Sequence, residues 1–391
     1  MVAQNFNLMR EVDLVTIAGI ISTFIALLLA IFIFSVESEN KISNKLFASF
    51  LVLNALEFSS WFMHLFLDAP NNLLNNLLIA KALLAYLPMP IFYLYILSVC
   101  YSDFKLKWKY LWHALPYIIT NVVMVPRFYL GNTTQNPELF ANYNNLYEII
   151  FLHISLHLQT FIYLTAGFIV LNKARKIFLE NYSSNTIATY KWLFQLLLFT
   201  SLLYAVALIK NILKYYGEDD VFNTAQTVVI LFILGIVCWY VLKALRHPNL
   251  FSGVDSKIAL AHNLAQEDES GQNAHYTNQI KQLTIYMENE KPYLNPSLTI
   301  KNLADQMGMN SRELSILINQ KLKQHFFDFV NGYRIQEAMN ILVDPAKKDE
   351  TVLEILYEVG FNSKSSFNTA FKKHTGQTPT EFRKIGLKSI T

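Results

Sequence analysis

Long apolar runs fill the first 250 residues of the chain. A helix that crosses a bilayer needs about 20 apolar residues, and seven runs approach or reach that length. The pattern predicts seven membrane-spanning helices, at residues 14–34, 46–67, 77–99, 111–125, 146–171, 192–213 and 222–245. The fourth has the weakest pattern, because it is short and contains Pro116 and Asn121.

The pattern changes after residue 297, where short amphipathic segments alternate with turn residues. Residues 298–322 predict a helix, a turn at Gly308 and a second helix. Thr299 and Ser311 are the expected N-caps, because a hydroxyl oxygen can accept a hydrogen bond from a free amide of the first turn. Residues at helical spacing form the expected buried stripe of the second helix: Leu314, Leu317 and Ile318.

The same arrangement returns after a longer amphipathic stretch. Residues 326–342 predict one long helix that ends before Pro345. Residues 351–383 then repeat the helix, turn and helix, with a cap at Thr351, a turn at Gly360 and a second cap at Ser363. The sequence therefore predicts two helix-turn-helix units joined by a long helix.

The stretch GFNSKSSFNTAFKKHTGQTPTEFR, residues 360–383, resembles the signature of the AraC family of bacterial transcription regulators. LTIKNLADQMGMNSRELS and the Tyr333–Arg334 pair match the same family, so the resemblance covers about residues 292–386. It implies two recognition helices that enter successive major grooves about one turn apart. Two positions depart from the family pattern. Leu356 stands where a small Ala is usual, and Lys323 where a Gly commonly ends the first recognition helix.

The resemblance also implies which residues contact DNA. Base-edge candidates in the first motif are Ser311, Arg312, Ser315, Ile316 and Asn319, and those in the second are Lys364, Ser365, Ser366, Asn368 and Thr369. Phosphate contacts, which add affinity without sequence information, are expected from Lys372, Lys373, Arg383 and Lys384. Residues 360–391 hold six basic residues and one acidic residue, which favours a nucleic-acid surface.

Charge density supports a boundary between a membrane part and a polar part. Residues 1–250 hold 16 Lys and Arg and 13 Asp and Glu, whereas the shorter stretch 251–391 holds 16 of each. We expect an all-α chain in three parts: a seven-helix membrane domain at 1–250, a polar linker at 251–279 with a short helical piece near 258–266, and the DNA-binding domain at 280–391. The two cysteines are far apart in apolar stretches, so no disulfide framework or zinc spacing is available.

Basic residues indicate the orientation of the expected spans. Loops that retain many Lys and Arg residues lie on the cytoplasmic side. One side of the seven-span arrangement carries eleven such residues and the other carries Arg10, Arg127 and Lys214. The eleven are Lys41, Lys45, Lys105, Lys107, Lys109, Lys173, Arg175, Lys176, Lys191, Lys243 and Arg246. The bias places the N-terminus outside and the DNA-binding tail in the cytoplasm of a bacterium.

Polar side chains inside the expected spans are candidates for a sensing site, because a charged group within a membrane is costly without a partner. These candidates are Glu57, His64, His153 and His157. The two closely spaced histidines could equally form ordinary hydrogen bonds between helices. Lys81 and Lys210 lie near outer ends, where long side chains reach the interface.

The sequence favours a transcription regulator in the cytoplasmic membrane, with double-stranded DNA, the lipid bilayer and an unknown small-molecule or envelope signal as partners. A homodimer is a further option. A transporter or channel with an autoregulatory DNA-binding tail is the main alternative, although the spans show no inverted repeat. A membrane enzyme is a third, but no phosphate loop, metal motif or nucleophile elbow is present. We expect no cofactor, metal or catalytic residue.

Overall fold

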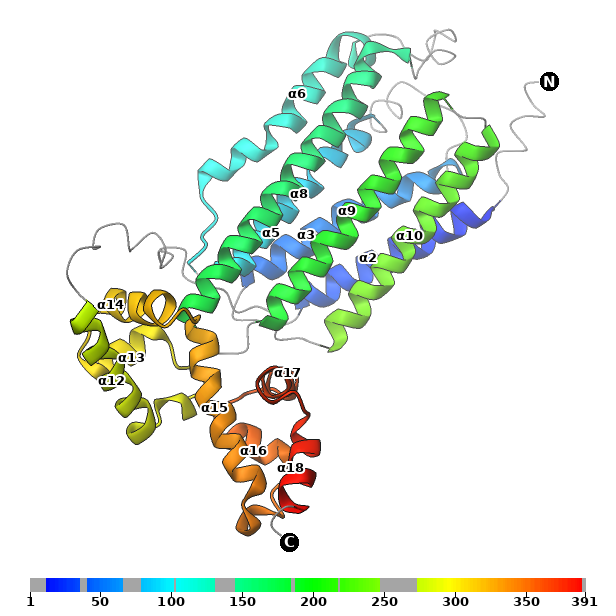
Figure 1. Ribbon diagram of the computed structural model, residues 1–391. Helices are drawn as coiled ribbons and strands as arrows, with labels where there is room; N and C mark the ends of the chain where they lie inside the picture. Colours follow the sequence, from blue (N-terminus) through cyan, green and yellow to red (C-terminus); the bar gives the residue numbers. More distant parts are fainter. Residues whose placement is uncertain are drawn as a thin grey trace. The chain divides into compact units, whose positions relative to one another are not determined.

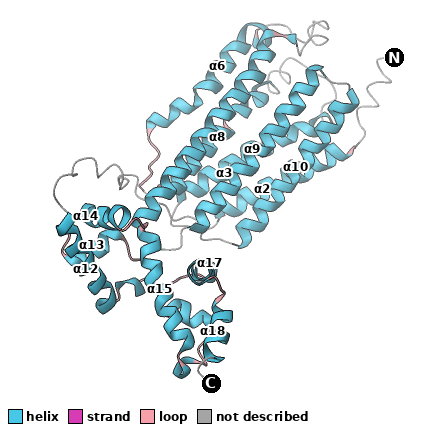
Figure 2. Ribbon diagram, viewed as in Figure 1, coloured by secondary structure: helices cyan, strands magenta, loops and turns pink. Residues whose placement is uncertain are grey.

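The computed structural model describes residues 12–35, 41–65, 79–101, 103–130, 145–183, 187–216, 219–246 and 273–388. All regular elements in these ranges are helices (Figures 1 and 2). The chain forms two compact units. Unit 1 comprises Met1–Leu171 and Lys191–Gly253, and unit 2 comprises Asn172–Tyr190 and Val254–Thr391. The three-part division expected from the sequence stays a prediction; unit 2 differs from it by including residues 172–190.

Unit 1 is built around helices that pack through small residues. Its helices are α2 (Leu14–Ser35), α3 (Lys41–Phe58), α5 (Pro88–Cys100), α6 (Leu115–Met124), the first part of α8 (Tyr147–Asn181), α9 (Ile187–Tyr216) from Lys191 onward, and α10 (Asp219–Arg246). Helix α2 packs against α3 and α10. Ala18, Ala26 and Ala55 are buried in that core, and small residues let helix backbones approach closely without a large hydrophobic effect between them.

Five helices are long and apolar enough to cross a membrane: Leu14–Ser35, Ile79–Cys100, Tyr147–Asn181, Tyr190–Tyr215 and Asp220–Lys243. They coincide with five of the seven expected spans. The second expected span begins in α3, whose 18 residues include Lys41, Lys45 and Glu57. The fourth is divided among a 3-10 segment Trp108–Ala114, α6, and a π-helical turn Val125–Tyr129. The count of seven is therefore not confirmed.

Unit 2 contains two hydrophobic cores that share one long helix. Helices α12 (Asn273–Glu290), α13 (Ile300–Met307) and α14 (Ser311–Ile316) surround the first core, and α16 (Val352–Glu358), α17 (Lys364–Thr375) and α18 (Pro379–Lys388) surround the second. Helix α15 (Phe326–Val343) contributes Phe326 and Val330 to the first core and Ile335 and Ala338 to the second. The expected helix near 258–266 lies outside the described residues.

Local capping explains where these helices begin. The side chains of Thr299, Thr351 and Ser363 accept backbone hydrogen bonds at the starts of α13, α16 and α17, so three expected N-caps are confirmed. The fourth was wrong by one residue. Asn310, not Ser311, caps α14, because its amide oxygen accepts the amide hydrogen of Arg312 at 2.8 Å.

Candidate nucleic-acid interface

The first motif consists of α13, a turn at Gly308 and α14. Gly308 has φ +64°, a conformation that costs a residue with a Cβ about 1–2 kcal/mol. Leu314 of α14 and Leu317, the first residue of the π-helical turn Leu317–Lys321 that follows it, are buried in the core. The opposite side of α14 carries Arg312, which is exposed. The first motif is therefore oriented as the sequence predicts, with a polar face directed away from its core.

The second motif consists of α16, a turn at Gly360 and α17. Phe367 and Phe371 are fully buried. Ser366 and Asn368 are half-buried, and the remaining predicted contacts of α17 are exposed: Lys364, Ser365, Thr369, Lys372 and Lys373. Lys373 forms an ion pair with Asp328 of α15, with 2.7 Å between Nζ and Oδ1. Helix α17 thus gathers three lysines and two hydroxyl groups on its accessible side.

The turn at Gly360 joins the second motif to the segment before the first. Gly360 has φ +87°, and a Cβ placed on it would lie 2.6 Å from the backbone oxygen of Tyr293 and 2.7 Å from that of Leu294. Only glycine fits so close to another backbone. This contact fixes part of the second motif against residues that precede α13.

Arg334 of α15 holds several backbone segments of unit 2 together. Its side chain is only 1 % exposed. The guanidinium donates to the backbone oxygens of Tyr293 (2.7 Å), Asn295 (2.7 Å) and Ser183 (2.9 Å), and it lies over the ring of Phe361. Burial lowers the pKa of Arg334 to about 10, so the group remains charged at neutral pH. A buried guanidinium needs such a full set of acceptors.

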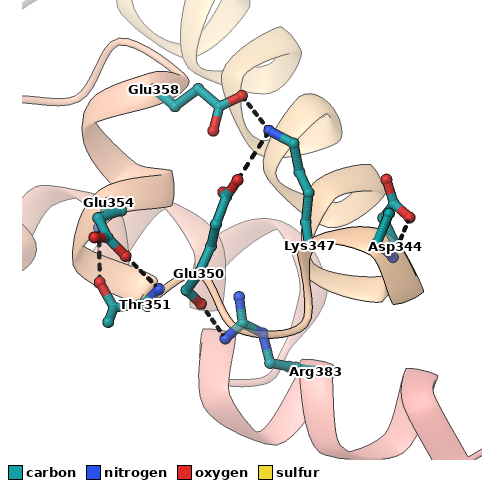
Figure 3. A network of polar contacts seen from close by, with 8 residues as sticks. Asp344, Lys347, Glu350, Thr351, Glu354, Glu358 and Arg383 are labelled. Carbon is teal, nitrogen blue, oxygen red and sulfur yellow. Dashed lines mark hydrogen bonds and ion pairs between the residues drawn. The ribbon is translucent and has the colours of Figure 1, made fainter.

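A polar network fixes the connection between α15 and α16 (Figure 3). Lys347 Nζ lies 2.5 Å from Glu358 Oε1 and 3.4 Å from Glu350 Oε1, and these carboxylates raise the pKa of Lys347. Arg383 of α18 donates to the backbone oxygen of Glu350 at 2.6 Å. Arg383, an expected phosphate contact, thus uses one nitrogen to anchor α18.

Thr351 and Glu354 form a capping box at the start of α16 (Figure 3). The Glu354 carboxylate accepts the Thr351 amide hydrogen at 2.7 Å. That hydrogen bond stabilises the charged carboxylate and lowers the pKa of Glu354.

The predicted contacts of the first motif are not equally accessible. Ser311 and Ile316 are half-buried, but Ser315 is only 4 % exposed. Asn319 donates through Nδ2 to the backbone oxygen of Glu180 (3.2 Å) and accepts the amide hydrogen of Phe326 through Oδ1 (3.2 Å). The backbone of Glu180 therefore lies against Asn319, one of the residues predicted to read DNA. No local pattern in residues 172–190 indicates this contact, so it could not be predicted from the sequence.

The expected sensing residues are placed in unit 1. His153 Nδ1 lies 2.6 Å from the Tyr215 hydroxyl, and His157 Nε2 lies 2.9 Å from Asn211 Nδ2. Both histidines thus link α8 to α9 by hydrogen bonds. The side chain of His64 lies outside the described part. Within the ranges the structure describes, no three His, Cys, Asp or Glu residues gather as a metal site.

Glu57 belongs to a small group of charged and polar side chains. The charges that act on its carboxylate are those of Lys81 and Lys210. Lys81 donates to the Ser60 hydroxyl at 2.6 Å, and Lys210 Nζ lies 5.7 Å from the centre of the Trp61 ring. The sequence singled out Glu57, and the structure places both lysines within its electrostatic reach.

Comparison with known proteins supports the C-terminal assignment. Residues 303–385 match a family model described as a helix-turn-helix domain. The uncharacterized transcriptional regulatory protein YesN of Bacillus subtilis (strain 168) is 37 % identical over 92 residues, which are 23 % of this chain and 24 % of YesN. An uncharacterized HTH-type transcriptional regulator of Staphylococcus aureus (strain COL) is 28 % identical over 145 residues, 36 % of this chain and 19 % of that protein. The chain thus spans a quarter or less of these relatives, and no solved structure matches it.

Proposed function

We propose that this chain is a membrane-embedded one-component transcription regulator of the AraC type, which binds specific double-stranded DNA through both helix-turn-helix motifs. The observation that carries the proposal is the accessible face of α17, where Lys364, Ser365 and Thr369 share the surface with Lys372 and Lys373. The chain's similarity to transcriptional regulators supports it.

Two classes of contact follow from the chemistry of these side chains. Arg312 can donate two parallel hydrogen bonds to a guanine edge, and Asn368 can pair with an adenine edge. Lys372 and Lys373 supply positive charge to phosphates, which displaces counterions and makes the affinity depend steeply on salt. Helix α15 connects the two motifs, so both recognition helices would address one operator on adjacent major grooves.

The binding experiment uses the full chain in lipid nanodiscs. Selection from a pool of random double-stranded DNA is expected to enrich one motif with two half-sites. The measured affinity should fall as salt rises, and Lys372→Ala should lower the salt slope by about 1. Lys348→Ala is the matched control, because Lys348 is exposed on the turn after α15. Enrichment no better than that of random sequence would contradict the proposal.

The membrane assignment rests on the apolar surface of unit 1. Helix α2 exposes large side chains such as Phe24, Ile31 and Phe34, which are 64–66 % exposed. A surface of this kind is unfavourable in water and favourable in lipid. The excess of basic residues on one side of the expected spans supports a cytoplasmic C-terminal domain, where DNA is present. Fusion of a periplasm-active or cytoplasm-active reporter after residue 391 should give only cytoplasmic signal.

Signal sensing is proposed for the group around Glu57. A carboxylate with two lysines nearby can hold a charged or zwitterionic small molecule. His153 and His157 would bias the packing of α8 on α9 through their hydrogen bonds to Tyr215 and Asn211. Glu57→Gln should remove the response of a target-gene reporter to its signal and leave operator binding intact. Solute uptake by vesicles containing the chain would favour a transporter instead.

A further inference from the structure

Unit 2 contains a stretch of the chain that is remote in sequence from the two motifs. The described part of Asn172–Tyr190 comprises the last turns of α8, Tyr182, Ser183 and the first residues of α9, and it belongs to the same compact unit as residues 273–388. The backbone amide and the hydroxyl of Ser183 both donate to the backbone oxygen of Leu298, at 3.2 and 2.6 Å. Tyr182 and Thr299 form an antiparallel β-bridge. The end of α8 is thus paired with the residues that begin α13.

The same stretch lies on the recognition helix of the first motif. At 100° per residue along α14, Arg312 and Ile316 lie on the side away from the buried Leu314. Asn319 follows in the π-helical turn Leu317–Lys321. Asn319 donates to the backbone oxygen of Glu180, and Ser315 beside it is buried. Phe178 packs against Phe327 with 6.1 Å between ring centres. A nucleic-acid base cannot reach Asn319 while the backbone of Glu180 occupies this position.

Arg334 links this stretch to the core of unit 2. Two of its nitrogens donate to Ser183, one to the backbone oxygen and one to the hydroxyl, at 2.9 and 3.3 Å. Each of these nitrogens has a second partner, Asn331 or Asn295. Departure of Ser183 therefore leaves each of these two nitrogens with one protein acceptor, so the guanidinium keeps part of its hydrogen-bond set when the segment is released.

We propose that residues 178–183, which continue a membrane-spanning helix, mask the DNA-reading face of the first motif. Their release allows the first motif to read its own half-site. This regulation rests on the proposed DNA-binding function. Docking of the segment and binding of DNA to the first motif exclude each other, so each weakens the other by the same factor. A signal that moves the end of α8 would in this way control operator affinity.

The first test compares two arginine substitutions in the full chain in nanodiscs. Ser183→Arg cannot keep the docked arrangement, because Ser183 is only 2 % exposed. Asn172→Arg adds the same charge at an exposed position of the same segment and is the matched control. Ser183→Arg should bind the selected operator about 5- to 150-fold more tightly than the control. At an operator concentration that half-saturates the control, hydroxyl-radical protection of the half-site read by the first motif should be stronger in Ser183→Arg than in the control. Equal affinity and equal footprints would overturn the proposal.

A reversible disulfide cross-link tests the proposal by comparing the oxidised and reduced forms of one variant chain. Paired residues of an antiparallel bridge lie at a Cα separation that a disulfide can span. In a Tyr182→Cys, Thr299→Cys chain, oxidation should confine the footprint to the half-site of the second motif, and reduction should restore the wild-type affinity. An oxidised chain that still protects both half-sites would overturn the masking. Failure of every form to bind selected DNA would instead contradict the proposed function itself.

Hydrogen exchange provides a readout that requires no substitution. The amide of Ser183 is hydrogen-bonded to Leu298 and should exchange slowly in the DNA-free chain. Addition of the selected operator should accelerate its exchange, whereas a scrambled duplex should not. Unchanged protection at saturating operator would show that the first motif binds DNA with the segment in place, which would also overturn the masking.

Discussion

The two helix-turn-helix motifs share one plan but present different surfaces. In the second motif, α17 exposes Lys364, Lys372 and Lys373. In the first, Ser315 is buried and Asn319 is bonded to the backbone of Glu180, so part of the corresponding face is covered. The recognition helix itself does not determine this difference. In the proposed account, the accessibility of the first motif's DNA-reading face depends on a segment of unit 2 that lies more than a hundred residues away in the sequence.

The turns of the two motifs also differ in what surrounds them, and this gives the largest expected effect. Gly360→Ala should destabilise the second core by about 3–5 kcal/mol. The cost of a side chain in a left-handed backbone conformation and the cost of the clash between the added Cβ and the backbone of Tyr293 and Leu294 add to each other. Gly308→Ala should cost only about 1–2 kcal/mol, since nothing lies within 4 Å of its added Cβ. Thermal unfolding of the full chain measures both. Equal losses would show that the Gly360 contact with Tyr293 and Leu294 does not hold the motifs together.

The effect of removing a base contact on operator affinity should depend on residues 178–183 in the first motif but not in the second. In the Ser183→Arg chain, Arg312→Ala should weaken operator binding by about 1–3 kcal/mol and relax specificity at one base pair. In the otherwise intact chain the loss should be smaller. Asn368→Ala in the second motif should cost the same in both backgrounds. Titrations of the four chains with labelled operator test this, and an Arg312 effect independent of residue 183 would contradict the comparison.

The ends of the two recognition helices predict a smaller effect. Gly376 ends α17 with φ +76°, whereas Lys323 adopts φ +53° after the first recognition helix. Lys323→Gly should therefore stabilise the first core by about 1 kcal/mol, and Gly376→Lys should destabilise the second by a similar amount. Chemical denaturation followed by fluorescence measures the change. A loss of stability in Lys323→Gly would mean that the lysine side chain makes a contact that outweighs its backbone strain.

The smallest expected effect is a difference in acid sensitivity. Capping carboxylates stand at Glu354 and Glu381 in the second motif, and their hydrogen bonds lower the pKa of each. The contribution of these carboxylates to folding stability is fully present above their pKa in the unfolded chain, near 4.5. It is lost as the pH falls through their lowered pKa in the folded chain. In the first motif, Asn302 occupies the position equivalent to Glu354. Glu354→Gln should reduce the loss of stability between neutral pH and about pH 3; an unchanged pH profile would contradict the assignment.

Local features of unit 2 followed from the sequence because each depends on a few neighbouring residues. Thr299, Thr351 and Ser363 are caps for chemical reasons that operate within one turn. Lys323 stands where a glycine is usual in the family pattern, and it adopts the positive φ that a glycine would adopt there without strain. Leu356, the other departure, is fully buried among the second core's residues. The shift of one cap to Asn310 shows that neighbouring hydrogen-bonding side chains compete for the same position.

Long-range features could not be predicted in this way. Ser183 and Leu298 are 115 residues apart, and their hydrogen bond leaves no periodic signal. Arg334 was visible as part of the Tyr333–Arg334 pair, but its contacts with Tyr293, Asn295 and Ser183 depend on the tertiary fold. In unit 1, apolar runs identified five long helices. They overestimated continuity at residues 111–125, where the backbone passes through 3-10, α and π turns.

The most direct test of the central claim is genome-wide DNA occupancy in cells that express the intact chain, measured together with transcript levels. We predict discrete bound loci next to genes whose transcription changes. Arg312→Ala combined with Lys372→Ala should abolish those peaks while the protein remains in the membrane. Lys348→Ala should keep them. Absence of discrete loci for the intact chain, or unchanged occupancy in the double variant, would contradict the assignment of both motifs as the DNA-reading surface.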